Sequence, residues 1–159
     1  MSNRANEASG GGGAGYRAII RITQAGTYTV VVGSGGIGYG GPKGASKTGT
    51  AGSATTLKKG STTLISAGGG TGGYASGSGS GATAGSGGKL TKNVTEVTVY
   101  TSKNGNAGTA HKGAGTVSGA AGPISGHTWG ASGSATGDYS GGSVGVSRHG
   151  YFYIKYLGT

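Results

Sequence analysis

Side chains able to carry out acid–base or metal chemistry are scarce in this chain. It has three histidines, His111, His127 and His149, one aspartate, Asp138, two glutamates and no cysteine. The histidines lie 16 and 22 residues apart, so they lack the short spacing of a metal site, although a trimer could bring one histidine from each chain to its axis. Serine is so frequent that a Ser-His-Asp arrangement can be drawn in many ways. We therefore expect no enzyme activity, no metal and no cofactor.

Two glycine-rich stretches approach phosphate-binding patterns. G-x-G-x-x-G begins at Gly33 after an expected strand, but residues 39–42, YGGP, follow where a helix would have to present its N-terminal amides to a pyrophosphate. Residues 41–48, GPKGASKT, approach the P-loop pattern, yet Ser46 stands at its second glycine and again no helix is expected. In a chain with 42 glycines we interpret both as chance matches.

Aromatic residues are the remaining candidates for recognition. In one interpretation each ring closes the edge of a glycine layer, with its polar tip in water. In the other, rings on connecting loops stack on sugars while neighbouring polar groups bind hydroxyls or anions. Both interpretations stay open for the rings inside glycine tracts, which are Tyr16, Tyr39, Tyr74, Trp129 and Tyr139. As candidate receptor contacts we single out His127 with Trp129, and Asp138 with Tyr139.

The charge of the chain indicates the kind of partner. Thirteen Lys and Arg against three Asp and Glu give a net charge of +10, which attracts polyanions such as acidic surface glycans, teichoic acid or nucleic acid. The basic residues are scattered, with Lys58-Lys59 the only adjacent pair, whereas nucleic-acid footprints cluster. We expect an anionic bacterial surface polymer as partner and no specific nucleic acid. No segment reaches the ~20 apolar residues of a membrane span or resembles a signal peptide.

Composition limits the fold that can position these residues. Glycine makes up 42 of 159 residues, while Leu, Ile, Val and Phe together make up only 21, so an ordinary side-chain core is not expected. Two prolines and the lack of a chain-wide G-X-Y repeat exclude collagen. Ordering many glycines requires compensating backbone hydrogen bonds, which polyproline II segments can form laterally. The alternative is that the glycine tracts, above all residues 68–88, are flexible linkers.

Short runs of β-branched and aromatic residues predict strands. Residues 17–23 and 27–32 are expected to pair as a hairpin, with Tyr28, Val30 and Val32 on one face. A second hairpin is predicted at residues 54–67, with its turn at Lys59-Gly60 and with Leu57 and Leu64 facing the same side. Residues 90–101 are expected to form a third hairpin or an edge strand, followed by a turn at Asn104-Gly105, and a further strand is expected at 151–157.

The predicted fold class is therefore all-β or irregular. It consists of short antiparallel strands and hairpins with packed, polyproline II-like polyglycine segments and essentially no α-helix, because no window shows helical periodicity. Residues 1–9 form an N-terminal arm, and residues 10–159 form one glycine-rich domain.

Three blocks of sequence resemble the glycine-rich domain of bacteriophage tail-fibre and minor tail proteins. They are TYTVVVGSGG at 27–36, SATTLKKGSTTLISAGGGTGG at 53–73 and GYFYIKY at 150–156. The family often begins with a strand before its first glycine run, whereas here only residues 1–9 precede Gly10. The resemblance implies packed polyglycine helices and receptor binding through loops at one end.

The expected function follows from this resemblance. We expect a phage virion protein, structural or receptor-binding, at a tail fibre or tail tip, assembled in the host cytoplasm and extracellular after lysis. Its expected partners are other tail-fibre or tail-tip proteins and a bacterial surface glycan, and a homo-oligomer, favoured as a trimer, would add stability. The alternative is a non-viral glycine-rich extracellular protein, such as a fibre subunit or an ice-binding protein. The net charge of +10 argues against an ice binder.

Overall fold

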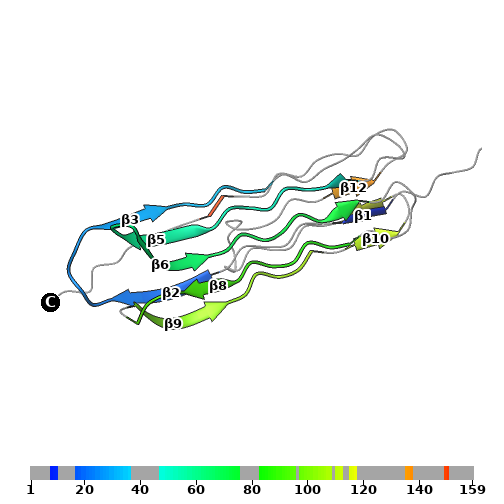
Figure 1. Cartoon of the computed structure of the whole chain (residues 1–159). Helices are drawn as coiled ribbons and strands as arrows, with labels where there is room; N and C mark the ends of the chain where they lie inside the picture. The colour runs from blue at the N-terminus through cyan, green and yellow to red at the C-terminus, as the bar shows by residue number, and fades with distance from the viewer. Residues whose placement is uncertain are drawn as a thin grey trace, which may run out of the picture.

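In the part of the chain that the structure describes, the fold consists of short antiparallel strands and extended glycine-rich segments. The computed structural model shows no helix there, and its twelve strands are two to seven residues long (Figure 1). The all-β class predicted from composition is thus confirmed. The described residues are 8–10, 17–36, 47–75, 83–95, 97–108, 110–112, 115–117, 135–137 and 149–150.

One end of the molecule is a small two-layered β-structure. One layer is a four-stranded sheet in the order β3-β5-β6-β8, and the other is the pair β2-β9 (Figure 1). The bounds are β2 Arg17–Ile22, β3 Tyr28–Val31, β5 Thr55–Lys59, β6 Thr62–Ala67, β8 Leu90–Lys92 and β9 Val97–Lys103. Each layer places one face against the other, as sheets must when only one side is apolar.

Two predictions about strand pairing are wrong. Strands β2 and β3 do not form a hairpin, because the connection at residues 23–27 crosses from one layer to the other and β2 pairs with β9. Residues 90–101 form no hairpin either, because they divide into β8 and β9, which lie in different layers, each at the edge of its sheet as the edge-strand alternative predicts. Crossing between layers lets consecutive apolar runs bury their side chains from opposite sides of one core. Local strand signals do not distinguish this arrangement from a hairpin.

The core between the two layers is small. Leu57, Leu64, Ile65 and Val97 are buried, and Val97 is completely inaccessible to solvent. Partly buried apolar residues surround them: Ile20, Ile22, Tyr28, Val30, Leu90, Val94 and Val99. Of the inward face predicted for β3, Tyr28 and Val30 contribute to the core, whereas Val32 lies beyond the strand and is 49% exposed. The core thus uses a large part of the few aliphatic side chains in the chain.

The hairpin predicted at residues 54–67 is confirmed. Gly60 has φ +58°, which places a left-handed residue at the first turn position between Lys59 and Thr62. The pairing shifts register between Leu57 and Lys58, so Leu64 is an extra residue in β6. This bulge turns both Leu64 and Ile65 inward, which strict alternation would not allow.

Five strands of this end continue into glycine-rich segments that form an elongated shaft (Figure 1). The segments keep the antiparallel order of the sheet, and the last of them continues β9. In that order they are 33–36, 49–54, 68–74, 83–89 and 104–108. Since β9 belongs to the second layer, the row of segments links the two layers into one structure.

Hydrogen bonds between the glycine segments recur at every third residue. The N–H groups of residues 68–74 donate to carbonyls of residues 83–89 in this way. The three bonds join Gly68 to Lys89, Thr71 to Ser86 and Tyr74 to Thr83, each at 2.9 Å. Side chains on a β-strand repeat every two residues, whereas polyproline II has three residues per turn. The spacing therefore identifies these segments as polyproline II-like chains bonded side by side.

The same spacing holds on both flanks. Gly49 and Gly52 donate to Gly73 and Gly70 at 3.0 Å each, while Gly105 and Gly108 donate to Gly88 and Gly85 at 3.2 and 2.9 Å. Residues 68–74 and 83–89 are thus bonded on two sides. Packed polyglycine is confirmed, and the linker interpretation of residues 68–88 does not hold for residues 68–75 and 83–88. Residues 76–82 lie outside the described part.

Side chains are excluded where these segments meet. A Cβ atom added at Gly69 or Gly72 would overlap the backbone of Gly52 or Gly49. The same overlap would occur at Gly33 and Gly36 against residues 50–54, at Gly87 against Gly105 and at Gly88 against Gly68. Each of these obstacles is backbone, which cannot rotate away. Glycine is therefore required at these contacts by the distance between chains.

Hydroxyl groups complete the hydrogen bonding at two equivalent places in the shaft. Thr71 N donates to Ser86 O, Ser86 N donates back to Thr71 Oγ1 at 2.8 Å, and the two hydroxyls lie 3.0 Å apart. Ser53 and Ser34 repeat this arrangement, with Ser34 N donating to Ser53 Oγ at 2.8 Å. Serine and threonine thus supply the acceptor for an N–H group that the lateral pairing does not satisfy.

Short strand pairs lie toward the opposite end of the shaft from the core. The pairs are β4 (Lys47–Thr48) with β7 (Tyr74–Ala75), β1 (Ala8–Gly10) with β10 (Ala110–Lys112), and β11 (Gly115–Val117) with β12 (Ala135–Gly137) (Figure 1). Strand β1 includes the last two residues of the arm predicted at 1–9, and it pairs within the chain. This short strand begins before the glycine run and includes its first residue, Gly10.

The turn predicted at Asn104-Gly105 is wrong. Residues 104–108 continue β9 as an extended segment, and Gly105 donates to Gly88 instead of turning the chain back.

Gly150, which directly precedes the strand predicted at 151–157, lies beside the first glycine segment, because its N–H donates to Gly33 O at 2.9 Å. The strand itself lies outside the described residues.

Replacing Gly72 by alanine tests whether backbone contact holds the shaft together. The added Cβ would overlap the carbonyl of Gly49, so Gly72→Ala should lower the free energy of unfolding by about 1–3 kcal/mol, as overpacking does. The matched control is Gly52→Ala, whose Cβ would lie 3.3 Å from its nearest neighbour, Ser34 O, and which should stay within about 1 kcal/mol of the parent. Thermal melts measure both variants. Equal stability of the two would contradict the packed shaft.

Candidate binding surface

Three chain connections meet at the end of the molecule that contains the core. Because β3, β5, β6 and β8 are successively antiparallel, the connections 23–27, 60–61 and 93–96 all lie at this end. The glycine segments leave the sheet at the other end of the same strands (Figure 1). We call this end, with its three connections, the loop end. It is the described region where side chains from different connections come together.

The connection at residues 23–27 is fixed by polar contacts with β3 and β5. Tyr28 OH donates to the carbonyl of Gln24 at 2.7 Å, and Lys59 Nζ donates to Gln24 Oε1 at 3.0 Å. Lys59 Nζ also lies 5.8 Å from the centroid of the Tyr28 ring, within the range of a cation–π interaction. Because Oε1 accepts from Lys59, the amide of Gln24 has Nε2 as its donor.

The connection after β8 is held by Asn93. Its backbone N–H donates to Leu64 O at 3.0 Å, and its side-chain Nδ2 donates to Thr63 O at 3.1 Å. These bonds tie the connection to the neighbouring strand β6 and orient the amide. Oδ1 of Asn93 is then the acceptor of that side chain.

An open depression lies between these two connections. It has a volume of about 660 Å³ and is lined by Gln24, Lys92, Asn93, Val94 and Thr95. The lining therefore contains two amides, an ammonium group, a hydroxyl and one apolar side chain. Such a mixture suits a hydroxyl-bearing ligand with an anionic group, since each side chain offers a different polar or apolar contact.

A second β-bulge, in the layer formed by β2 and β9, directs an aromatic ring outward. Register along β2 and β9 shifts between Ile19 and Ile20, so Tyr100 is the extra residue of β9. Tyr100 is 58% exposed, and Arg21 donates to its hydroxyl at 3.4 Å. Bulges commonly re-aim a side chain in this way. The result is an exposed ring beside a guanidinium group.

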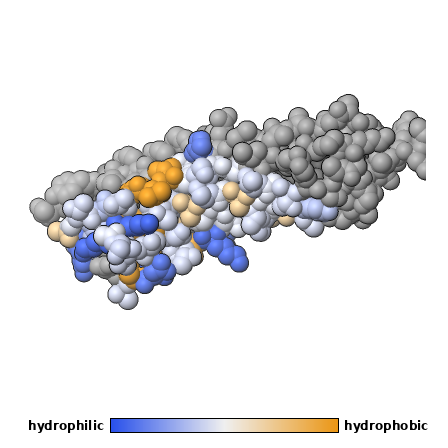
Figure 2. All heavy atoms as spheres, turned by 45° about the horizontal axis from the view of Figure 1, so that its top comes forward, coloured by the Kyte–Doolittle hydropathy of each residue, from blue (hydrophilic) through white to orange (hydrophobic). Residues whose placement is uncertain are grey.

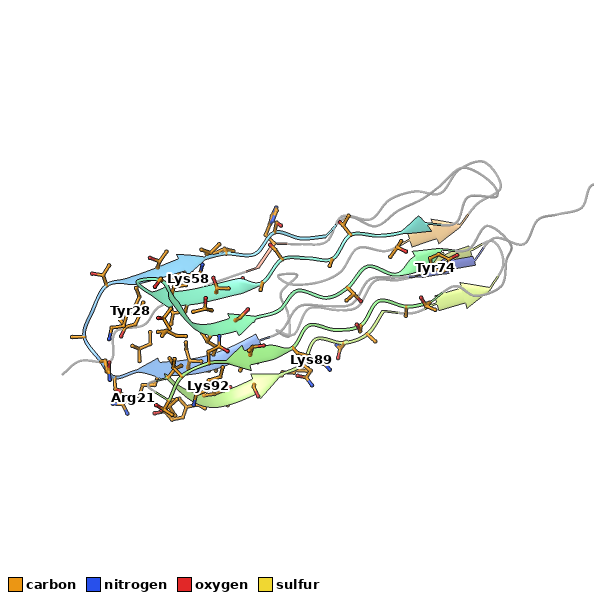
Figure 3. The ribbon with its side chains drawn as sticks, in the orientation of Figure 1. Arg21, Tyr28, Lys58, Tyr74, Lys89 and Lys92 are labelled. Atoms are coloured by element: carbon orange, nitrogen blue, oxygen red, sulfur yellow. The ribbon has the colours of Figure 1, made fainter. Side chains whose placement is uncertain are left out.

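Several positive charges lie at the loop end. Arg21, Lys58, Lys59 and Lys92 belong to the ends of its strands, and Figure 3 shows Arg21 and Lys92 on the same side of it. The described residues include no aspartate or glutamate, although Glu96 belongs to one connection by sequence. Four cations and one carboxylate leave a formal charge of +3. In Figure 2 strongly hydrophilic side chains lie over this end beside a hydrophobic patch, and further strongly hydrophilic side chains stand farther along the molecule among residues of intermediate hydropathy.

The candidate receptor contacts from the sequence are not part of this surface. His127, Trp129, Asp138 and Tyr139 all lie outside the described residues. Of the rings in glycine tracts only Tyr74 is described, and it is a partly buried residue whose backbone exchanges two hydrogen bonds with Thr83. These predictions therefore stay predictions.

The histidine and phosphate patterns have structural explanations in the described part. His149 Nδ1 accepts a hydrogen bond from Gly35 N at 3.3 Å, which is a packing role. The N–H groups of Gly33 and Ser34 donate to Thr55 Oγ1 and Ser53 Oγ, so this part of the G-x-G-x-x-G stretch satisfies its donors internally. Lys47 and Thr48, which end the P-loop-like stretch, form strand β4 and do not open a helix.

The described residues contain no group of three His, Cys, Asp or Glu side chains placed to hold a metal ion. The structure shows no apolar helix of membrane-spanning length among them. Comparison of the chain with protein-family models, with curated proteins and with solved structures gives no match. The function has to be inferred from the shaft, the loop end and the sequence blocks described above.

Sequence analysis missed the residues of the loop end. The sequence pattern places Gln24 in the turn of the first expected hairpin and residues 93–95 within the stretch of strand character at 90–101. The sequence signal for a connection here is the pair of polar residues Lys92-Asn93, which interrupts a run of strand-forming residues. It becomes informative only when β8 and β9 are known to lie in different layers.

The two tyrosines of this end should differ in their effect on stability. Tyr28 packs against the core and bonds Gln24, so Tyr28→Ala should cost roughly 1–3 kcal/mol. Tyr100 is mostly exposed, and Tyr100→Ala should stay within about 0.5 kcal/mol of the parent. Urea unfolding of both variants provides the comparison. A large loss for Tyr100→Ala would show that its ring is structural and not an accessible surface group.

Proposed function

We propose that this chain is a phage virion protein at a tail fibre or tail tip, without enzymatic activity, that contributes to attachment to the host surface. The observation that carries the proposal is the shaft, in which five glycine segments pack backbone to backbone and end in a basic, loop-bearing surface. The resemblance of residues 27–36, 53–73 and 150–156 to glycine-rich phage tail domains supports the same function.

The physical properties of the shaft fit an attachment role. Lateral bonds every third residue fix each segment along its length, so a displacement at one end is carried to the other without a large apolar core. The net charge of +10 attracts anionic polymers of a bacterial surface and steers encounter with them. In this proposal the chain acts as a homo-oligomer, with a trimer favoured, among other tail-fibre or tail-tip proteins.

The second candidate is a non-viral glycine-rich extracellular structural protein. Its support is the shaft itself, because packed polyglycine is a structural solution that does not depend on a virion. A flat ice-binding face is disfavoured, since Lys89 and other cations project from the described surface. The two candidates predict different locations for the protein, on phage particles or on cell-surface material. An imaging experiment distinguishes these locations.

Immunogold electron microscopy tests the proposed function. Antibodies raised against the purified chain should label one end of the tail of phage particles from the source culture, and they should slow adsorption of those particles to host cells. Antibodies against an unrelated basic protein are the control. Labelling of cell-surface material with no labelled particles would contradict the virion proposal and support the non-viral candidate.

A further inference from the structure

We infer that the depression at the loop end is a binding site for an anionic polymer of hydroxyl-bearing units, such as a carboxylated polysaccharide. Its residues are Gln24, Lys92, Asn93, Val94 and Thr95. The inference rests on the proposed function only for the bacterial surface from which such a polymer would come. The site itself is argued from the chemistry of its lining.

The donors and acceptors of the lining are set by bonds made outside it. Lys59 donates to Gln24 Oε1, and Asn93 Nδ2 donates to Thr63 O, so Gln24 Nε2 and Asn93 Oδ1 are the donor and the acceptor of these two lining side chains that remain for a ligand. A sugar hydroxyl both donates and accepts, and it can therefore bond to both amides. Fixed amides lose little conformational entropy when such a ligand binds.

Lys92 provides the charge that selects an anion. It is exposed at the end of β8, directly before Asn93, and the one carboxylate that belongs to the same connection by sequence, Glu96, lies outside the described residues. Arg21 lies at the same end (Figure 3) and holds the exposed ring of Tyr100 through its hydroxyl. An ammonium group beside two amides, with an exposed ring and a guanidinium group on β9 and β2, matches a polymer in which anionic groups alternate with sugar faces.

The apolar side chain of Val94 distinguishes this surface from one that attracts charge alone. Val94 packs against the core and also lines the depression, where it can contact the C–H face of a sugar ring. Polyphosphate has the charge of the proposed ligand but neither hydroxyls nor a ring. Single-stranded DNA has charge and rings, but its phosphates and bases do not offer the same hydroxyl pattern.

Binding of defined polymers to the full chain tests the site. Polygalacturonate is the carboxylate probe, poly(glycerol phosphate) is a phosphodiester probe with hydroxyl-bearing units, and neutral dextran is the uncharged control. We expect one or both anionic probes to bind, and binding to weaken as salt rises because the interaction is partly ionic. Dextran should bind far more weakly. Preference between the two anionic probes identifies the kind of polymer that the site takes.

Two lysines of the same strand region provide matched variants. Lys92 lines the depression and Lys89 lies three residues earlier, at the shaft (Figure 3). Both are exposed, so their substitution should not impair folding, which circular dichroism would verify. Lys92→Gln should weaken binding about tenfold, the loss expected for one charge-assisted contact, and Lys92→Glu should weaken it further. Lys89→Gln and Lys89→Glu should each change affinity by less than about threefold, since they alter only the general field.

Three results would overturn the inference. Equal losses for the Lys89 and Lys92 variants would show that general charge attracts the polymer. Equal or tighter binding of polyphosphate or single-stranded DNA would show that charge alone, or nucleic acid, is recognised. Failure of both anionic probes to bind would show that the depression is not a binding site for such a polymer. Labelling of phage tails by the antibody would still support the proposed function. The two proposals can therefore fail separately.

Discussion

Contact between backbones at glycine is the constraint on which the rest of the structure depends. At contacts between neighbouring segments of the shaft, required glycines recur at every third residue, as at Gly33 and Gly36 or at Gly69 and Gly72. A three-residue turn exposes N–H and C=O groups on all sides, so each segment can bond to neighbours laterally. At these glycine contacts the neighbouring backbone leaves no room for a side chain. The shaft therefore needs almost no apolar core, and the few aliphatic residues serve the loop end.

The difference between the glycine shaft and the loop end explains where a ligand can be recognised. In the described shaft the residues between glycines are mostly small, and several of their hydroxyls, such as those of Thr71 and Ser86, bond to the shaft itself. Large polar and aromatic side chains gather where the strands end and the connections cross between layers. Two β-bulges adjust this region, one turning Leu64 inward and the other turning Tyr100 outward. The same kind of irregularity, a β-bulge, thus shapes the core in one strand and the surface in another.

Composition and local patterns predicted the class of the fold but not its connections. The excess of glycine and the shortage of aliphatic residues led correctly to packed polyglycine, and Lys59-Gly60 located a real turn.

The predicted pairing of residues 17–23 with 27–32 was wrong, because a strand signal carries no information about the layer to which a strand belongs. The turn at Asn104-Gly105 failed for a related reason, since a glycine needed for close approach resembles a glycine needed for a turn. The period of three within residues 68–73, GGGTGG, was the signal that would have separated the two. The loop end escaped prediction because its residues become neighbours only through the crossing of layers.

Scalar coupling across hydrogen bonds, measured by NMR on the ¹⁵N,¹³C-labelled chain, tests the central claim most directly. The account predicts correlations from the amide nitrogen of Thr71 to the carbonyl carbon of Ser86, from Gly52 to Gly70 and from Gly108 to Gly85, with bonded donors three residues apart along each segment. Correlations at every second residue would show an ordinary β-ladder. Their absence throughout residues 68–74 and 83–89, together with rapid exchange of those amides, would show that the glycine segments do not pack, and the account of the shaft would be wrong.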